Sequence, residues 1–548
     1  MDMLKIKKRM RKSLLLAACA LLLSAGAYAG GYQTNSNQNA AFGRNLSQEA
    51  MIDILATYAN PAGVGFLAPG WHFAFSNQSA FQTRTANSWF MNPQVGPLAQ
   101  GIVNGVENTS ATKRYKGTAT VPVIPSVDLA YVENRWSLGF HFGFVGGGGK
   151  CEFEDGLGSF ESKVSMLPLL LNSLSGSQQP SRYSIDTYMR GKQYYFGGQL
   201  NGTYKVTDNL SVALGMRLLY ATANYYGYVR NMQVVTPTSA TPVDKAIEPM
   251  IQQMVAAVPA LGPVMSGITS VAGDVNLNCD QIGWGVTPII GIDWRINKQW
   301  NVAAKYEFKT RLRLENKNGE SASASALAQL DEYKDGAKVA ADQPSILYIG
   351  AQYSPIEKVR INAGGHVYFD KQATQYDHRE KELDGQSWEV LAGAEYDINK
   401  TFTVSAGWQT THYGLGKNSK YISDMSFVCN SNSYGLGTRI HVSKKVALDI
   451  SYFKTVYRHY NKYHEDYNNI KYNFGALLTP MGEKVTDVAN DIMAEDQAAG
   501  IDPQTDPRMA LIGQLNTAVD GIKQMDTSGN DRLLRTNDVV GVGVIVNF

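Results

Sequence analysis

The residues from 305 to 315 place charged side chains at alternate positions. The charged members are Lys305, Glu307, Lys309, Arg311, Arg313 and Glu315, and the apolar residues between them are Tyr306, Phe308, Leu312 and Leu314. In an extended strand, this alternation puts all the charged groups on one face. Lysine or arginine there could hold a carboxylate through charge-assisted hydrogen bonds, and the mixed signs could equally form a salt-bridged network.

No motif for covalent or metal-dependent catalysis accompanies this charge ladder. The sequence lacks a Gly-x-Ser-x-Gly elbow, a His-Glu-x-x-His pair and a phosphate-binding loop. His459 and His464 could contact a metal or haem, but we favour solvated loop histidines. We therefore expect no enzyme activity, no catalytic residue, no metal site and no cofactor.

The elements that must position the ladder are β-strands, because apolar residues recur with a period of two. In residues 136–144, Trp and Phe alternate with Ser, Gly and His, and residues 540–548 place Val and Phe at every second position. A soluble sandwich would show the same alternation, so no single strand decides the fold class.

The connections between the strands are more informative than the strands themselves. Short polar joints, such as those at 134–135, 207–209 and 443–444, alternate with long irregular segments. The long segments are expected as outer loops at 83–110, 154–189, 231–278, 316–342 and 460–531. This asymmetry predicts an all-β transmembrane barrel of about fourteen antiparallel strands. Since a charge facing lipid costs about 2–4 kcal/mol at the midplane, the charge ladder is expected to face the lumen.

The amino-acid composition agrees with a transmembrane β-barrel. The chain has 548 residues with 52 glycines and 30 tyrosines, and only 18% of its side chains are charged. Beyond the first thirty residues there is no run of about 18 apolar residues, which excludes an ordinary transmembrane helix. A formal net charge of +2 argues against a nucleic-acid partner.

The first 29 residues read as a signal peptide. Lysines and arginines between Lys5 and Lys12 precede an apolar stretch, and Ala27-Tyr28-Ala29 is a cleavage site of small residues. Lipidation at Cys19 is a rival interpretation, although it leaves a short apolar core. Removing 1–29 takes six of 50 basic residues and one of 48 acidic ones, which leaves a net charge of −3.

Three cysteines remain after this removal. An odd number excludes a complete disulfide framework. Cys151 and Cys279 could pair, and isolated buried thiols are an equally good interpretation.

The segment before the first expected strand carries a family resemblance. Gly30-Gly31-Tyr32, Ala41–Arg44 and Asn60-Pro61-Ala62 follow one another in order. This order resembles the N-terminal plug of the FadL-type outer-membrane transporters of long-chain fatty acids and hydrophobic compounds. The resemblance implies a plug at 30–70 and a barrel at 71–548. It also implies a ligand pocket beside Gly30, Gly31 and Tyr32, and location in the outer membrane of a Gram-negative bacterium.

Four consecutive glycines, Gly146, Gly147, Gly148 and Gly149, follow the apolar strand at 136–145. Glycine weakens a strand and commonly marks a bulge or kink. In proteins of the FadL type, a kink in the third strand opens a lateral gap through which ligand leaves, and the resemblance assigns that role to this run. A flexible passage from strand to loop is the alternative.

Two apolar stretches within the expected outer loops could form an entry groove. Leu170 and Leu171 belong to the first, and Ile247, Met250, Ile251 and Met254 share one helical face in the second. Helix–helix packing between loops is the alternative. The resemblance also predicts a basic headgroup-binding residue within 220–226, but that stretch has none, and Arg217 and Arg230 flank it.

Together these features predict a monomeric channel for passive uptake of long-chain fatty acids or similar hydrophobic molecules. Its other expected partners are outer-membrane lipids and the barrel-assembly machinery. One alternative keeps the barrel and changes the cargo to haem or aromatic hydrocarbons. Another is a surface receptor or adhesin that acts through its long loops.

Overall fold

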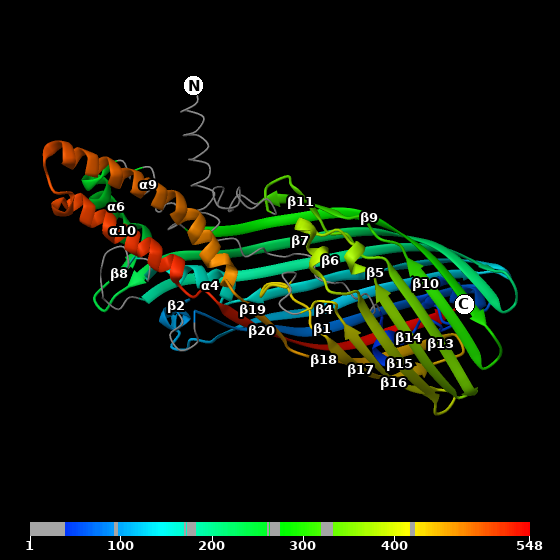
Figure 1. Cartoon of the computed structure of the whole chain (residues 1–548). Helices are drawn as coiled ribbons and strands as arrows, with labels where there is room; N and C mark the ends of the chain where they lie inside the picture. Colours follow the sequence, from blue (N-terminus) through cyan, green and yellow to red (C-terminus); the bar gives the residue numbers. More distant parts are fainter. Residues whose placement is uncertain are drawn as a thin grey trace, which may run out of the picture.

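The computed structural model of the protein describes residues 39–91, 97–168, 171–172, 182–259, 262, 274–318, 333–416 and 422–548. The signal peptide at 1–29, Gly30, Gly31, Tyr32 and Leu170 lie outside these residues. Within them, fourteen long antiparallel strands form a closed barrel, because each pairs with the next and the last pairs with the first (Figure 1). They are β1 (Gly70–Phe90), β4 (Lys113–Val132), β5 (Trp136–Phe153), β6 (Arg182–Lys205), β7 (Leu210–Val235), β9 (Val275–Arg295), β10 (Trp300–Glu307), β13 (Ile346–Ile356), β14 (Val359–Tyr368), β15 (Ser387–Asp397), β16 (Phe402–His412), β17 (Ser431–His441), β18 (Val446–Tyr457) and β20 (Gly529–Asn547).

Closure depends on the pairing of the two terminal strands. Strand β1 pairs with β20 along its whole length, from His72 opposite Asn547 to Phe90 opposite Gly529. All the inter-strand groups at this seam are therefore bonded within the sheet, as a bilayer requires. The prediction of about fourteen antiparallel strands in an all-β barrel is confirmed.

The outer surface is apolar and the inner surface is polar. On β5, Trp136, Leu138 and Phe142 are exposed on the outside, whereas Ser137 and His141 are buried on the inside. This is the side-chain distribution of a barrel that crosses an outer membrane, with apolar groups toward lipid. Among the described residues, no helix is both long enough and apolar enough to cross a membrane.

The strands are longer than a bilayer needs, and this changes the expected loop boundaries. Strands β6 and β7 have 24 and 26 residues, whereas about 9–11 span the membrane. Consequently β1 continues to Phe90 inside the expected loop 83–110, and β6 begins at Arg182 inside the expected loop 154–189. The wall continues beyond the lipid with the same period of two, so the sequence pattern does not mark where the membrane ends.

The external end of the barrel, opposite the short turns, carries helices and short strands (Figure 1). These are α4 (Gly158–Val164), α6 (Val243–Ala257), α9 (Ile470–Ala499), α10 (Pro507–Gln524), the 3₁₀ helices η2 (Pro97–Gln100), η4 (Asp370–Gln372), η5 (Tyr376–Glu382), η6 (Tyr467–Asn469) and η7 (Pro503–Thr505), and the strands β2 (Gly101–Val103), β3 (Val106–Glu107), β8 (Ala240–Pro242), β11 (Arg313–Asn318), β12 (Lys338–Ala340) and β19 (Tyr460–His464). Buried apolar residues from α4, α6, α9 and α10 join the ends of the long strands in one cluster, here called the loop core.

The three cysteines that follow the predicted signal peptide are separate thiols. Cys151, Cys279 and Cys429 are all buried and none is in a disulfide, so Cys151 does not pair with Cys279. Each fills space as a small apolar side chain.

Candidate functional site

The N-terminal residues 39–67, here called the lumenal segment, are buried and contact the inward faces of strands on all sides of the barrel. The segment contains α2 (Ala40–Arg44), α3 (Ala56–Ala59) and the 3₁₀ helix η1 (Pro61–Phe66). The stretch at 49–55, between α2 and α3, forms turns and bends. Glu49 and Asp53 bond to His366 and Arg439 of the wall, and these side-chain contacts favour an irregular path over a helix.

One end of the lumenal segment is held by a buried ionic network. Arg44 donates from Nε to Asp449 Oδ1 at 2.9 Å and from Nη1 to Ser405 Oγ at 2.9 Å, and it also pairs with Glu395. Arg439 bonds the other oxygen of Asp449 at 2.8 Å. A planar guanidinium matches several oxygens at once, so this contact fixes the position of α2 against β15, β16 and β18.

A second contact joins the middle of the segment to the same side of the wall, at β14 and β17. His366 on β14 lies between Glu49, 2.6 Å from its Nε2, and Glu389, 2.9 Å from its Nδ1. Asp53 accepts a hydrogen bond from Arg439 at 2.5 Å. Charged groups of the segment are therefore matched by charged groups of the wall.

The Asn60-Pro61-Ala62 motif closes the segment against β6 and β9. The Asn60 side chain caps η1 by accepting from Ala62 N, and its Nδ2 donates to Ile292 O at 3.0 Å. Thr203 donates to Pro61 O at 2.9 Å. The motif therefore fixes the end of the segment to the wall.

The first part of the predicted charge ladder does face the lumen. Lys305 Nζ donates to Glu307 Oε1 at 2.8 Å and to the Tyr58 carbonyl of the lumenal segment at 2.9 Å. Arg217, which the sequence singled out only as a flanking residue, bonds both oxygens of Glu307 at 2.8 Å. Lys305 and Glu307 therefore belong to a salt-bridged network that holds the segment.

The second part of the ladder faces the other way. Leu312 and Leu314 are fully buried inside, whereas Arg311 is exposed and Arg313 is half-buried. Eight residues separate Glu307 from Glu315, but only seven separate their β9 partners Ile289 and Ile282. One extra residue reverses every side chain beyond it.

The cause of this reversal is a proline on the neighbouring strand. Regular pairing of β9 with β10 stops where Phe308 would face Pro288, which has no N–H to donate. Lys309 is exposed at the same break. The prediction that Lys309, Arg311 and Arg313 line the lumen is therefore wrong, because it assumed one uninterrupted strand.

The glycine run on the third strand of the barrel breaks the wall. Gly147 and Gly149 have φ values of +97° and +68°, and the pairing of β5 with β6 shifts register at this point. A Cβ on Gly147 would lie 2.4 Å from the carbonyl oxygen of Gln193, so only glycine fits. The run is therefore a kink within the strand, not only a passage to a loop.

The same break separates β5 from its other neighbour. Strand β4 pairs with β5 at Thr118–Glu152 and again at Val127–Phe142, and among the described residues no pair joins them between these points. Pro122 and Pro125 lie in this stretch of β4, and neither has an N–H for a ladder bond. The two prolines in this strand were therefore a second sequence signal for the break, in addition to the glycine run.

The inner wall beside this break is apolar. Val145, which precedes the glycine run, packs with Tyr58 of the lumenal segment and with inward-facing residues of the neighbouring strands. These are Tyr195, Leu219, Ala221, Leu312, Leu314 and Ala341. The reversed leucines thus contribute to an apolar lining that ends at the break.

Two arginines absent from the predicted site lie side by side on the inner wall. Arg84 of β1 is directly opposite Arg535 of β20, and both face inward yet stay partly exposed. Among the described residues neither Nε has a hydrogen-bond partner, although Arg535 Nη1 reaches the Phe427 carbonyl at 3.5 Å. In the described part of the chain no carboxylate pairs with either guanidinium, and two adjacent cations of this kind can bind an anion. Only the pairing of the first strand with the last brings them together.

Comparison with solved structures shows which known fold this barrel resembles. No family model and no curated protein matches the sequence. A crystal structure of a Pseudomonas aeruginosa FadL homologue matches 95% of this chain and 100% of its own, with a TM-score of 0.57 and 12% identity. The barrel has the fold of a FadL homologue. The P. putida toluene transporter TodX (12% identity, TM-score 0.49, 92% of this chain and 99% of its own) and the Ralstonia pickettii toluene transporter TbuX (10%, 0.47, 94% and 99%) are also similar.

In this FadL-like barrel, the predicted entry-groove residues are packed together in the loop core. Ile247 and Met254 of α6 are buried there, and Leu171 and Ile251 pack against them. The Met250 side chain lies outside the described part of the chain. These apolar side chains are therefore packed within the loop core, and an entry groove along them stays a prediction.

The loop core of the FadL-like barrel contains a buried lysine that should make it sensitive to pH. Burial in α4 lowers the pKa of Lys163 to about 7, although Asp424 acts in the opposite direction. Between about pH 7 and 10.5 an opened loop holds a proton on Lys163 that the packed loop does not. Packing should therefore strengthen as pH rises through this window, by about tenfold in the closed-to-open ratio per pH unit.

The measurement is protease cleavage of residues 465–528, which pack against α4 through Asn468 and Ser162. The cleavage rate of Lys163→Met relative to wild type, taken at pH 6.5 and pH 8.5, cancels the pH dependence of the protease. We expect the variant to be relatively more resistant at pH 6.5. An equal ratio at both values would contradict the assignment.

Proposed function

We propose that this barrel takes up long-chain fatty acids, or similar hydrophobic molecules with one anionic end, and releases them sideways between β4 and β5. The observation that carries the proposal is the missing ladder between Thr118 and Val127, next to an apolar inner wall. A polar solute gains nothing from an opening onto lipid, whereas an apolar chain can pass directly from the wall into the bilayer.

The lumenal segment supports a lateral rather than an axial exit. It is held to the wall at Arg44, Asp53 and Asn60 near the short turns, and at Glu49 nearer the loop end of β14. We propose that it acts as a plug that blocks direct passage along the barrel axis. Ligand would then enter through the loop core and leave at Gly146–Gly149.

The arginine pair supports a carboxylate at one end of the ligand. Gln82, two residues from Arg84, pairs with Ala119, the first β4 residue of the unpaired stretch. An anion held by Arg84 and Arg535 would therefore lie near one edge of the break, with its chain along the apolar lining. A neutral aromatic hydrocarbon would make no use of two uncompensated guanidinium groups.

The test is fatty acid binding to purified Arg84→Met/Arg535→Met. We expect oleate to bind about tenfold or more weakly, because charge-assisted hydrogen bonds to the carboxylate are lost. Binding of oleyl alcohol, which has the same chain and no charge, should be unchanged. Arg532→Met is the matched control, since this arginine is exposed on the same strand.

Two results would count against the proposal. Equal oleate affinity in the double variant and wild type would show that the two arginines do not bind the carboxylate. Equal loss for oleate and oleyl alcohol would indicate a distorted barrel rather than a lost anion contact.

A further inference from the structure

The wall formed by β5, β6, β7 and β9 continues above the lipid at the external end of the barrel (Figure 1). On β6, Tyr204 and Tyr194 both face outward and lie ten residues apart. About 9–11 residues of a tilted strand cross the membrane, and aromatic girdles mark both interfaces, so these tyrosines lie near the two edges of the lipid. The part of β6 from Arg182 to Lys192 therefore lies above the lipid.

Side chains on this upper wall alternate between the loop core and the outside. Met189 of β6 and Tyr225 of β7 are buried in the loop core. Tyr188 and Arg190, on either side of Met189, therefore face outward, as does Tyr226 beside Tyr225. The outward side chains of the two strands form one surface, here called the outer tyrosine patch, which consists of Tyr188, Arg190, Lys192, Tyr226, Tyr228 and Arg230.

The three tyrosines of the patch pack on one another. Tyr188 stacks on Tyr228 with 5.9 Å between ring centroids, and Tyr226 meets Tyr188 edge to face at 6.0 Å. The Arg230 guanidinium lies 4.3 Å from the ring centroid of Tyr228, and that of Arg190 lies 5.2 Å from the ring centroid of Tyr226. These cation–π contacts hold the guanidinium groups close to the rings.

The three cations of the patch form no ion pair within the described part of the chain. Arg190 Nη2 donates to Asn224 Oδ1 at 3.0 Å, and Arg230 Nε donates to Asn276 Oδ1 at 2.5 Å. Lys192 is exposed. The neutral amides orient the arginines without cancelling their charge.

Two carboxylates lie opposite the arginines in the strand register, and both bind other groups. Glu152 of β5, opposite Arg190, pairs with Lys150 Nζ at 2.8 Å. Asp186 of β6, opposite the other arginine, accepts a hydrogen bond from Asn231 Nδ2 at 2.5 Å. The cations of the patch are therefore available to an anion from outside the chain.

The patch combines ring faces, amides and uncompensated cations, and a phosphorylated sugar can use all three. The C–H face of a sugar ring packs on an aromatic ring, its hydroxyl groups bond to amides, and its phosphate binds guanidinium and ammonium groups. At about 3.4 Å per residue and a tilt of about 45°, Lys192 and Tyr188 lie about 5 Å and about 14 Å above Tyr194. The outer leaflet of a Gram-negative outer membrane consists of glycolipid, whose phosphorylated sugars occupy this height.

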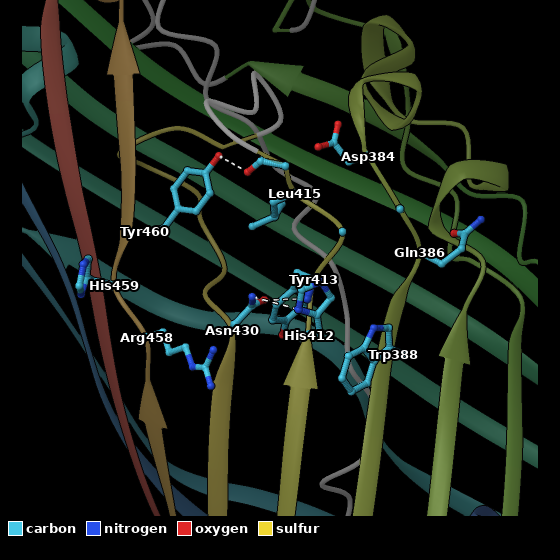
Figure 2. Close-up of a pocket in the computed structure, with 13 residues that line it drawn as sticks. Asp384, Gln386, Trp388, His412, Tyr413, Leu415, Asn430, Arg458, His459 and Tyr460 are labelled. Carbon is cyan, nitrogen blue, oxygen red and sulfur yellow. Dashed lines mark hydrogen bonds between the residues drawn. The ribbon is translucent and has the colours of Figure 1, made fainter.

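The strands across the barrel are too short to form such a wall. Strands β15, β16 and β17 have 11 residues each, about the number that crosses the membrane. At their external ends lies a pocket of about 570 Å³ (Figure 2). Its residues Tyr413 and Leu415 belong to the inward-facing apolar cluster that includes Ala86 and Leu533, so this pocket is part of the lumen side.

We propose that the outer tyrosine patch binds the phosphorylated sugar headgroup of a glycolipid in the surrounding outer leaflet. Arg190 and Lys192 bind a phosphate, and the rings of Tyr188 and Tyr226 pack against the sugar. The patch is on the outer face of the wall, so it does not depend on the transported ligand. The bound glycolipid would lie next to the break in the wall, because Lys192 is one residue from the position opposite Gly149.

The experiment measures lipid binding to the delipidated full-length protein in detergent by native mass spectrometry. The probes are the phosphorylated glycolipid Kdo2-lipid A, its deacylated headgroup, and phosphatidylglycerol, which is anionic but has no sugar. We expect Kdo2-lipid A to bind most tightly. Arg190→Gln/Lys192→Gln should weaken its binding about tenfold or more, because charge-assisted hydrogen bonds to phosphate are lost.

Two further variants separate the sugar contact from a general charge effect. Tyr226→Leu should weaken binding of Kdo2-lipid A and leave phosphatidylglycerol unchanged. Arg135→Gln/Lys205→Gln is the matched control, because it removes the same two charges at the end of the barrel with the short turns. This control should bind Kdo2-lipid A as wild type does.

Three outcomes would overturn the proposal. A deacylated headgroup bound as tightly as the glycolipid would make the patch a site for a soluble sugar phosphate. Equal affinity of wild type for phosphatidylglycerol and Kdo2-lipid A would show that the rings do not recognise a sugar. Unchanged glycolipid binding in Arg190→Gln/Lys192→Gln, with the heat-dependent gel migration of a folded barrel, would show that these cations do not bind the phosphate.

Discussion

Valine in place of Gly147 is expected to reduce fatty acid uptake by about tenfold to a hundredfold while the barrel still assembles. At φ +97°, a residue with a Cβ carries strain of about 1–3 kcal/mol, and this Cβ would meet the Gln193 carbonyl at 2.4 Å. This strain would force the chain out of its kinked conformation in β5. A straighter β5 can pair with β4 across the break, which would close the proposed exit.

The matched control for this variant is Gly202→Val on the adjacent strand β6. A Cβ there would meet nothing within 4 Å, and its φ is not in the left-handed region. Uptake of labelled oleate by cells that express equal amounts of each protein is the measurement. If Gly147→Val supported normal uptake and Gly202→Val did too, lateral release through this kink would have to be abandoned.

Methionine in place of Arg44 is expected to release the lumenal segment from the wall. The change removes the shared partner of Glu395, Asp449 and Ser405, all of them buried. Breaking a buried ion pair by removing one member costs about 3–5 kcal/mol when a charge is left alone. Here Glu395 keeps Arg360 and Asp449 keeps Arg439, so we expect a cost of about 3 kcal/mol or less. The cost falls on the contact between segment and wall, because the strands keep their own ladders.

Conductance in planar bilayers measures this release directly. We expect wild type to conduct ions poorly and Arg44→Met to conduct at least tenfold more, since a barrel of this width is an aqueous pore when it is unobstructed. Arg44→Lys, which keeps one charge, should be intermediate, and Arg135→Met in an exposed turn should resemble wild type. Wild-type conductance in Arg44→Met would show that the segment does not plug the lumen through this contact.

The parts of the fold that the sequence predicted are those that lipid constrains most strictly. The alternation at Trp136–Phe144 and at the C-terminus follows from one face in lipid and one in the lumen, and short turns need specific polar residues. Gly146–Gly149 stood out because no regular strand tolerates four glycines at low cost. These signals are local, so one sequence is enough to read them.

The features that could not be predicted from the sequence depend on the register between strands that are distant in the chain. Arg84 and Arg535 are separated by nearly the whole chain, and only the β1–β20 pairing makes them neighbours. The facing of Leu312 depends on a proline in another strand, Pro288, which stops the regular pairing. Arg44 likewise holds the lumenal segment only because β15, β16 and β18 each provide a partner for it. Pattern within one segment cannot carry such information.

The height of the wall has a consequence for where capture occurs. At a tilt of about 45°, the 26 residues of β7 rise about 60 Å, which is roughly twice the thickness of the hydrocarbon core. The loop core that α6, α9 and α10 join therefore stands tens of ångströms above the lipid. Under the proposed function, a sparingly soluble molecule would be captured there from the aqueous phase, well above the lipid surface. The tall wall would then conduct the ligand from above the membrane down to the level of the lipid.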